Sequence, residues 1–134
     1  MRWGARDMSK GPTDPLYELQ FDHLPDHLYV YVKIPKLNEA AVMSYIRAIA
    51  DEAVKADYRR ILLVRDIQDS LPDVVNYNLS QTTGEWLRGI KVAWVNPHPE
   101  QQPAMQFFID VASNRGARYK LFTDVDSART WLLA

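Results

Sequence analysis

The sequence contains no cysteine, and no apolar run approaches the length of a membrane-spanning helix. The absence of cysteine excludes disulfide bonds, thiolate metal sites, iron–sulfur ligation and thiol catalysis. A bilayer span needs about 20 consecutive apolar residues, so we expect no membrane span. The formal net charge is only −1. This lack of a basic excess argues against nucleic acid or an anionic membrane surface as a partner.

Signals for export are also missing from the first fifteen residues, which are charged and contain glycine and two prolines. A signal peptide needs an apolar central stretch and a small-residue cleavage site, and this segment has neither. We therefore expect residues 1–15 to form a flexible arm and the protein to be cytoplasmic. Residues 16–134 have the length of one compact domain.

Hydrophobic periodicity predicts an α/β protein. Apolar stretches rich in β-formers predict five strands, at residues 16–21, 28–34, 59–66, 90–96 and 118–124. Helical spacing of apolar residues predicts four helices, at residues 39–56, from Ser70 to Gly89, at 101–115, and after Asp124. The order β-β-α-β-α-β-α-β-α predicts a hairpin followed by parallel strands, with helices on both faces. We expect a single-domain layered sandwich around a mixed, mostly parallel five-stranded sheet.

Three polar residues are predicted to be helix N-caps: Asn38, Ser70 and Asp124. Ser70 and Asp73 would form a capping box, with Pro72 in the first turn of the helix. The predicted inner stripe of this helix is Val75, Leu79, Thr82 and Trp86. The predicted inner stripe of the helix at residues 101–115 is Met105, Phe108, Val111 and Ala112.

Three segments carry a resemblance to a known family. They are the strand RILLVRD ending in Asp66, the strand IKVAWVN, and the closing stretch RYKLFTDVDSARTWL. With this element order, the chain resembles the SpoIIAA-like proteins of the STAS group, which includes anti-sigma-factor antagonists. The resemblance implies a module that binds a regulatory protein partner, or a small apolar ligand. Phosphorylatable STAS proteins carry Asp-Ser-Ser-Gly-Leu after the third strand. Here Asp69 and Ser70 are followed by leucine and proline, so that motif is incomplete.

The predicted start of the second helix holds most of the candidate binding residues. Ser70 is interpreted mainly as a cap, and alternatively as a regulated site, because a helix N-terminus also favours phosphate. Asp66, Asp69 and Asp73 could hold Mg²⁺ through their carboxylates, but the favoured interpretation is a solvated turn with cap residues. If the chain is a STAS-like module, its interaction face should comprise Asp69, Ser70, Asp73 and Asn76.

Polar residues also follow the other predicted parallel strands: Asn96, His98, Thr123 and Asp124. Ligands of parallel α/β sheets collect at the carboxyl ends of the strands. His98 and Asp66 could therefore form an acid–base pair. The alternative is that Asn96, Pro97 and Pro99 simply form a turn.

Two further groups are candidate ligand sites. His23 and His27 lie in the predicted hairpin turn, where a metal site is possible but a solvated turn is the default. The aromatic residues are expected to build the core. Phe107 and Phe108 cannot both point inward, so one of them is a candidate contact for a pocket or partner.

The leading hypothesis is a non-enzymatic regulatory module that acts by protein–protein interaction. A carrier of an apolar small molecule or lipid is the alternative, and an acid–base enzyme using His98 and Asp66 is the third. We expect no cofactor and no bound metal, and homo-oligomerisation stays open.

Overall fold

A computed structural model describes residues 17–134, so the arm predicted at residues 1–15 lies outside the described residues. The elements are β1 (Glu18–His23), β2 (Leu28–Lys33), α1 (Glu39–Ala56), β3 (Arg60–Asp66), α2 (Asp73–Trp86), β4 (Lys91–Val95), the 3₁₀ turn η2 (Pro99–Gln101), α3 (Gln102–Ser113), β5 (Arg118–Phe122) and α4 (Val125–Leu133). No helix among these is both long enough and apolar enough to cross a membrane.

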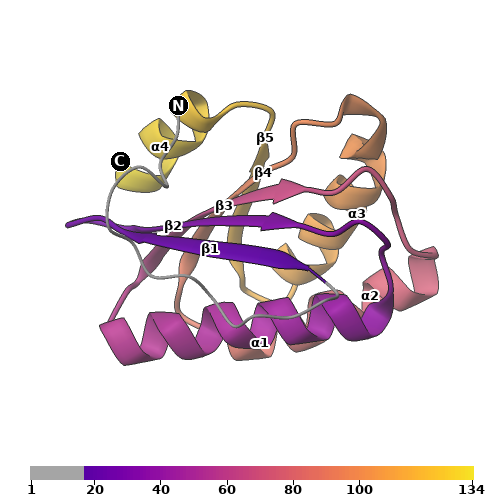
Figure 1. Ribbon diagram of the computed structural model, residues 1–134, viewed down its shortest axis with the longest axis horizontal. Helices are drawn as coiled ribbons and strands as arrows, with labels where there is room; N and C mark the ends of the chain where they lie inside the picture. The colour runs from indigo at the N-terminus through magenta and orange to yellow at the C-terminus, as the bar shows by residue number, and fades with distance from the viewer. Residues whose placement is uncertain (1–16) are drawn as a thin grey trace.

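The strands form one five-stranded sheet in the order β1-β2-β3-β4-β5 (Figure 1). β1 and β2 are antiparallel, and every later pair is parallel. Leu63 at the centre of β3 is aligned with Val30 on one side and with Trp94 on the other. The predicted mixed α/β sandwich is therefore confirmed.

Helices cover both faces of the sheet, but unequally. α1, α2 and α3 lie on one face and α4 lies on the other (Figure 1). Because strand side chains alternate between faces, Leu63 points to the three-helix core while Leu62 points to α4. Both are buried, which confirms the prediction that β3 is a central strand.

Two of the three predicted N-caps are confirmed. The Asn38 side chain accepts a hydrogen bond from the amide of Ala41 at 2.9 Å, and α1 has its predicted bounds. The Asp124 side chain accepts from the amide of Ser127 at 2.7 Å at the start of α4. Each carboxylate or amide oxygen satisfies one of the amides that a helix start leaves free.

The third predicted cap is wrong. α2 begins at Asp73, its N-cap is Pro72, and no side chain caps it, so Ser70 lies in the preceding loop and forms no capping box. The cause is Pro72: a proline disfavours the helical conformation of the residue before it, here Leu71. A helix starting after Ser70 would have needed Leu71 to be helical.

The buried stripes of the later helices also differ from prediction. In α2 the inward residues are Asn76, Leu79, Ser80 and Thr83, whereas Val75, Thr82 and Trp86 are only half-buried. In α3, Ile109 takes the inward position predicted for Val111. Met105, Phe108 and Ala112 are buried as predicted. The helix is shorter than the predicted range 101–115, because Gln101 belongs to η2 and α3 ends at Ser113.

The hairpin is tighter than predicted, because β1 extends to His23 and leaves a turn that the amide of Leu24 closes on the carbonyl of His27 at 3.1 Å. His23 is thus a strand residue rather than a turn residue. Tyr17, Leu19 and Phe21 alternate along the chain and are all buried on one face of the sheet.

Candidate functional site

The carboxyl ends of β2, β3 and β4 bring three polar side chains together on the α4 face of the sheet. The Tyr31 hydroxyl donates a hydrogen bond to Oδ2 of Asp66 at 2.6 Å. His98 Nε2 lies 2.6 Å from the other carboxylate oxygen, Oδ1. The sequence prediction that His98 and Asp66 meet at this edge agrees with this contact, and its chemical role stays a prediction. We call these three residues the carboxylate cluster.

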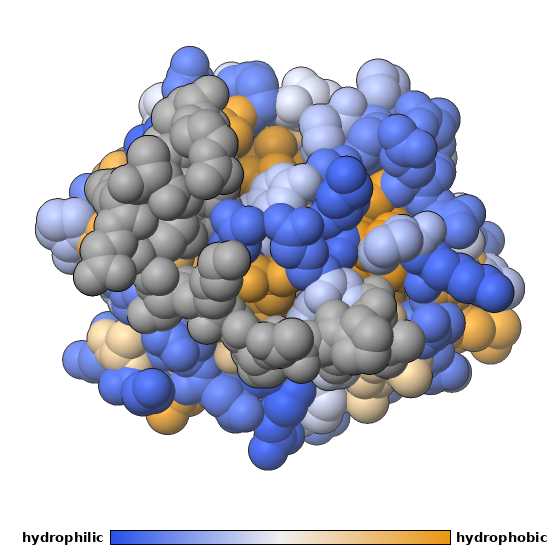
Figure 2. All heavy atoms as spheres, viewed as in Figure 1, coloured by the Kyte–Doolittle hydropathy of each residue, from blue (hydrophilic) through white to orange (hydrophobic). Residues whose placement is uncertain are grey.

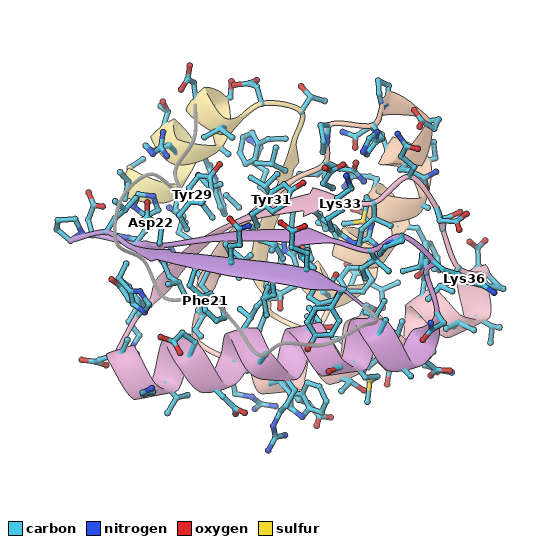
Figure 3. The ribbon with its side chains drawn as sticks, viewed as in Figure 1. Phe21, Asp22, Tyr29, Tyr31, Lys33 and Lys36 are labelled. Carbon is cyan, nitrogen blue, oxygen red and sulfur yellow. The ribbon has the colours of Figure 1, made fainter. Side chains whose placement is uncertain are left out.

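Strand register explains why Tyr31 joins the carboxylate cluster. β2 and β3 are parallel, and Lys33 is aligned with Asp66. Tyr31 is two residues earlier and shares the face of Lys33, since alternate strand residues point the same way. Figure 3 shows Tyr31 and Lys33 on the side of β2 that faces α4, while Phe21 of β1 points toward α1.

The hydrogen bonds decide the protonation of the cluster. Burial raises the pKa of Asp66, but hydrogen bonds from Tyr31 and His98, with the nearby charge of Lys33, outweigh it and hold that pKa below its usual range. Burial and the neighbouring carboxylate together raise the pKa of Tyr31. Asp66 is therefore ionised and Tyr31 neutral at pH 7. Since an ionised carboxylate only accepts, His98 carries its proton on Nε2.

The loop after β4 holds His98 in place. The backbone amide of His98 donates to the side-chain oxygen of Asn96 at 3.0 Å, and Asn96 is fully buried. The amide of Asn96 in turn donates to the carbonyl of Phe122 at 3.1 Å. His98 Nδ1 has no partner within residues 17–134. With one ring nitrogen oriented by a carboxylate, the other is placed to exchange a proton or accept a hydrogen bond.

The candidate residues near α2 separate into two groups. Asp69, Ser70 and Asp73 are exposed, as a binding surface requires. Asn76 is buried instead, and its side-chain amide donates to the carbonyl of Leu71 at 3.2 Å, which corrects its predicted place on the surface. Asn76 supports the loop from inside.

Two exposed apolar residues on α2 were not predicted. Val74 and Tyr77 are 68% and 39% exposed, and with Val54 on α1 they are the large hydrophobic side chains exposed in the part of the chain described. Three residues apart, they share one face of the helix. Arg115 donates to the Tyr77 hydroxyl at 3.0 Å and fixes its ring. The doublet Val74-Val75 was a usable signal, since adjacent helical residues cannot both point inward. We call Asp69, Ser70, Asp73, Val74 and Tyr77 the α2 surface.

The remaining candidates lie apart from the carboxylate cluster and the α2 surface. His23 Nε2 lies 2.6 Å from Glu52, and His27 Nδ1 lies 2.7 Å from Asp26. Phe108 is buried and Phe107 is half-buried on α3. Within residues 17–134, no group of three or more His, Asp or Glu side chains has the arrangement of a metal site.

On the face seen in Figure 2, hydrophobic residues show in small areas separated by hydrophilic ones. No protein-family model and no curated protein matches the chain.

Proposed function

We propose that the chain is a non-enzymatic regulatory module of the STAS type that binds a protein partner through the α2 surface. The observation that carries the proposal is the exposure of Val74 and Tyr77 beside exposed acidic residues. Protein interfaces combine a small apolar centre with a polar rim, and aromatic residues are enriched at their centres. The α2 surface has that composition on a rigid helix.

The fold and the sequence resemblance support the same proposal. The mixed sheet and the β3–loop–α2 arrangement agree with the architecture that the resemblance implies. In the antagonists that the chain resembles, the segment after the third strand carries the regulatory motif. Here that segment is the exposed loop leading to α2.

A photo-crosslinking amino acid at position 74 tests the proposal in cells of the source organism. The matched control is the same substitution at Val54, which is 77% exposed and also lies on a helix. We expect a discrete protein adduct from position 74 and none from position 54. Equal adducts from both positions, or none from position 74, would contradict the proposal.

Charge reversal then tests the partner identified by crosslinking. Asp69→Lys with Asp73→Lys should weaken the complex, and association should slow as salt is raised, because the acidic rim attracts a basic partner. Asp126→Lys is the control, since Asp126 is likewise an exposed acidic residue in the first turn of a helix. Both variants lose similar helix-dipole stabilisation. If the double variant and Asp126→Lys weaken binding equally, the effect of charge is nonspecific and the α2 surface is not the interface.

The 2.6 Å contact between Asp66 and His98 favours a second candidate, an acid–base enzyme. Its test is an activity screen with ester, amide and phosphoester substrates. The matched control for His98→Asn is His23→Asn, because His23 also lies 2.6 Å from a carboxylate, that of Glu52. Activity lost only in His98→Asn would favour the enzyme. Activity that both variants keep would exclude His98 as its acid or base.

The carrier alternative needs a cavity for an apolar chain. The pocket between the three-helix layer and the sheet has a volume of about 20 Å³. This is room for roughly one water molecule, so the pocket does not support a lipid-carrying function.

A further inference from the structure

The small pocket under the α2 surface contains an unusual buried cation. Residues of α1, α2 and α3 line it together with Arg65 near the end of β3 and Trp94 near the end of β4. Arg65 of β3 lines this pocket and is only 8% exposed. Its neighbour Asp66 points to the opposite face, so the pocket is separate from the carboxylate cluster.

The guanidinium of Arg65 lacks a counter-charge. Its Nε donates to the hydroxyl of Tyr45 at 3.2 Å, and Tyr45 is a neutral acceptor. No other hydrogen bond and no ion pair of Arg65 occurs within residues 17–134. A guanidinium has five N–H donors, so four of them have no protein acceptor. The terminal nitrogens of Arg65 are not among the fully enclosed atoms of the described chain, so solvent reaches them through the pocket. Burying a charge without a counter-charge costs several kcal/mol.

A second unpartnered donor belongs to Trp94, a residue that also lines this pocket. The indole Nε1 of Trp94 is buried and has no hydrogen-bond partner within the described chain. The ring is held by edge contacts to Phe108 and Tyr119, each with ring centroids 5.4 Å apart. The Trp94 N–H is therefore a fixed donor at a place where the protein offers it no acceptor, although buried polar groups are normally satisfied.

We infer that this pocket binds one small inorganic anion of the size of chloride, between the guanidinium of Arg65 and the indole N–H of Trp94. The volume of about 20 Å³ admits a single water-sized species. Both unpartnered groups are pure donors, so the species that satisfies them is an acceptor. Water would accept these hydrogen bonds but would leave the positive charge of Arg65 uncompensated. An anion accepts the hydrogen bonds and also compensates the charge.

Asp69 is the protein group that could compete for Arg65. It lines the pocket mouth, but its side chain is exposed and forms no ion pair in residues 17–134. An anion site predicts that chloride raises the melting temperature, whereas an Arg65–Asp69 ion pair predicts that chloride has no such effect.

The first test measures the melting temperature in sodium chloride, with sodium gluconate keeping the ionic strength constant. Gluconate is too large for the pocket. A bound anion stabilises the folded state, so we expect the melting temperature to rise and saturate with chloride. The rise should be about 5 °C when chloride is about ten times its Kd. Identical melting in both salts would overturn the inference.

Variants assign the effect to the pocket. Arg65→Met has similar length without the charge, and replacing a buried charge by an apolar side chain is often neutral for stability. Arg65→Met should abolish the dependence of the melting temperature on chloride. The control Arg47→Met removes an exposed arginine of α1 and should keep it. Asp69→Asn should also keep it. If chloride dependence appears only in Asp69→Asn, Asp69 is the counter-charge of Arg65 and the inference is wrong.

Crystals of the unaltered chain soaked in sodium bromide give a direct answer, even if Arg65→Met fails to fold. An anomalous peak within hydrogen-bond distance of both Arg65 and Trp94 Nε1 is the expected result. A water molecule, or the Asp69 carboxylate, in that place without a bromide peak would refute the site.

Discussion

Replacing Tyr31 by Phe removes one hydroxyl from the carboxylate cluster and leaves the ring in place. Oδ2 of Asp66 then loses the hydrogen bond that it accepts at 2.6 Å. Hydrogen bonds to charged groups contribute about 1.5–3 kcal/mol, and because Asp66 is partly exposed, water replaces some of this. We expect the variant to lose about 1–2 kcal/mol of unfolding free energy at pH 7 in urea denaturation.

The same hydrogen bond holds the pKa of Asp66 down, so its removal should raise that pKa. A depressed carboxylate pKa stabilises the folded state above the unfolded pKa of about 3.9, and this stabilisation is lost as the pH falls through the folded value. The difference between Tyr31→Phe and the unaltered protein should therefore shrink below about pH 4. An NMR titration of the Asp66 carboxyl carbon measures the shift directly.

Tyr58→Phe is the matched control, because the Tyr58 hydroxyl donates at 2.7 Å to an uncharged acceptor, the carbonyl of Leu24. The unfolding free energy that Tyr58→Phe loses should stay the same as the pH falls through the pKa of Asp66. The reasoning is refuted if the Asp66 pKa is the same in Tyr31→Phe and in the unaltered protein, or if Tyr58→Phe raises it equally.

Two more predictions concern the fold. Leu63→Asp should unfold the domain, because it places an unpaired charge at a side chain that is 1% exposed in the central strand; native-like circular dichroism and melting would contradict the assignment. Asn38→Ala should cost about 1 kcal/mol by removing the α1 cap. Ser70→Ala, at an exposed loop position, should change stability by less than about 0.5 kcal/mol in the same urea assay; equal losses would mean that Ser70 is a cap after all.

The sequence was sufficient for the parts of the fold that local chemistry determines. Asn38 and Asp124 each precede an apolar-periodic segment with no proline in its first turn, so their capping roles could be predicted. Ser70 precedes Leu71-Pro72, and the restriction that Pro72 imposes on Leu71 moves the helix start to Asp73. That restriction is readable from the sequence.

The sites could be predicted only in part, because they depend on register and burial. His98 and Asp66 were expected at one edge of the sheet because parallel strands end there together. Tyr31 was missed because its place beside Asp66 depends on the alignment of β2 with β3, which no local pattern specifies. Arg65 was missed for a similar reason, since a charged residue at a strand end is normally exposed.

The end of β3 links the separate features of this edge of the molecule. Arg65 and Asp66 are consecutive, so their side chains leave the sheet on opposite faces. Asp66 is compensated by hydrogen bonds from Tyr31 and His98, whereas the charge of Arg65 has no partner in the described chain. The loop after Asp66 then borders the Arg65 pocket through Asp69 and Ser70, which also belong to the α2 surface. An anion held by Arg65 would therefore lie directly beneath the residues proposed to meet a partner. The screening of Arg65 by that anion would leave Asp69 and Asp73 as the uncompensated charges, so in the proposed function their acidity would select a basic partner.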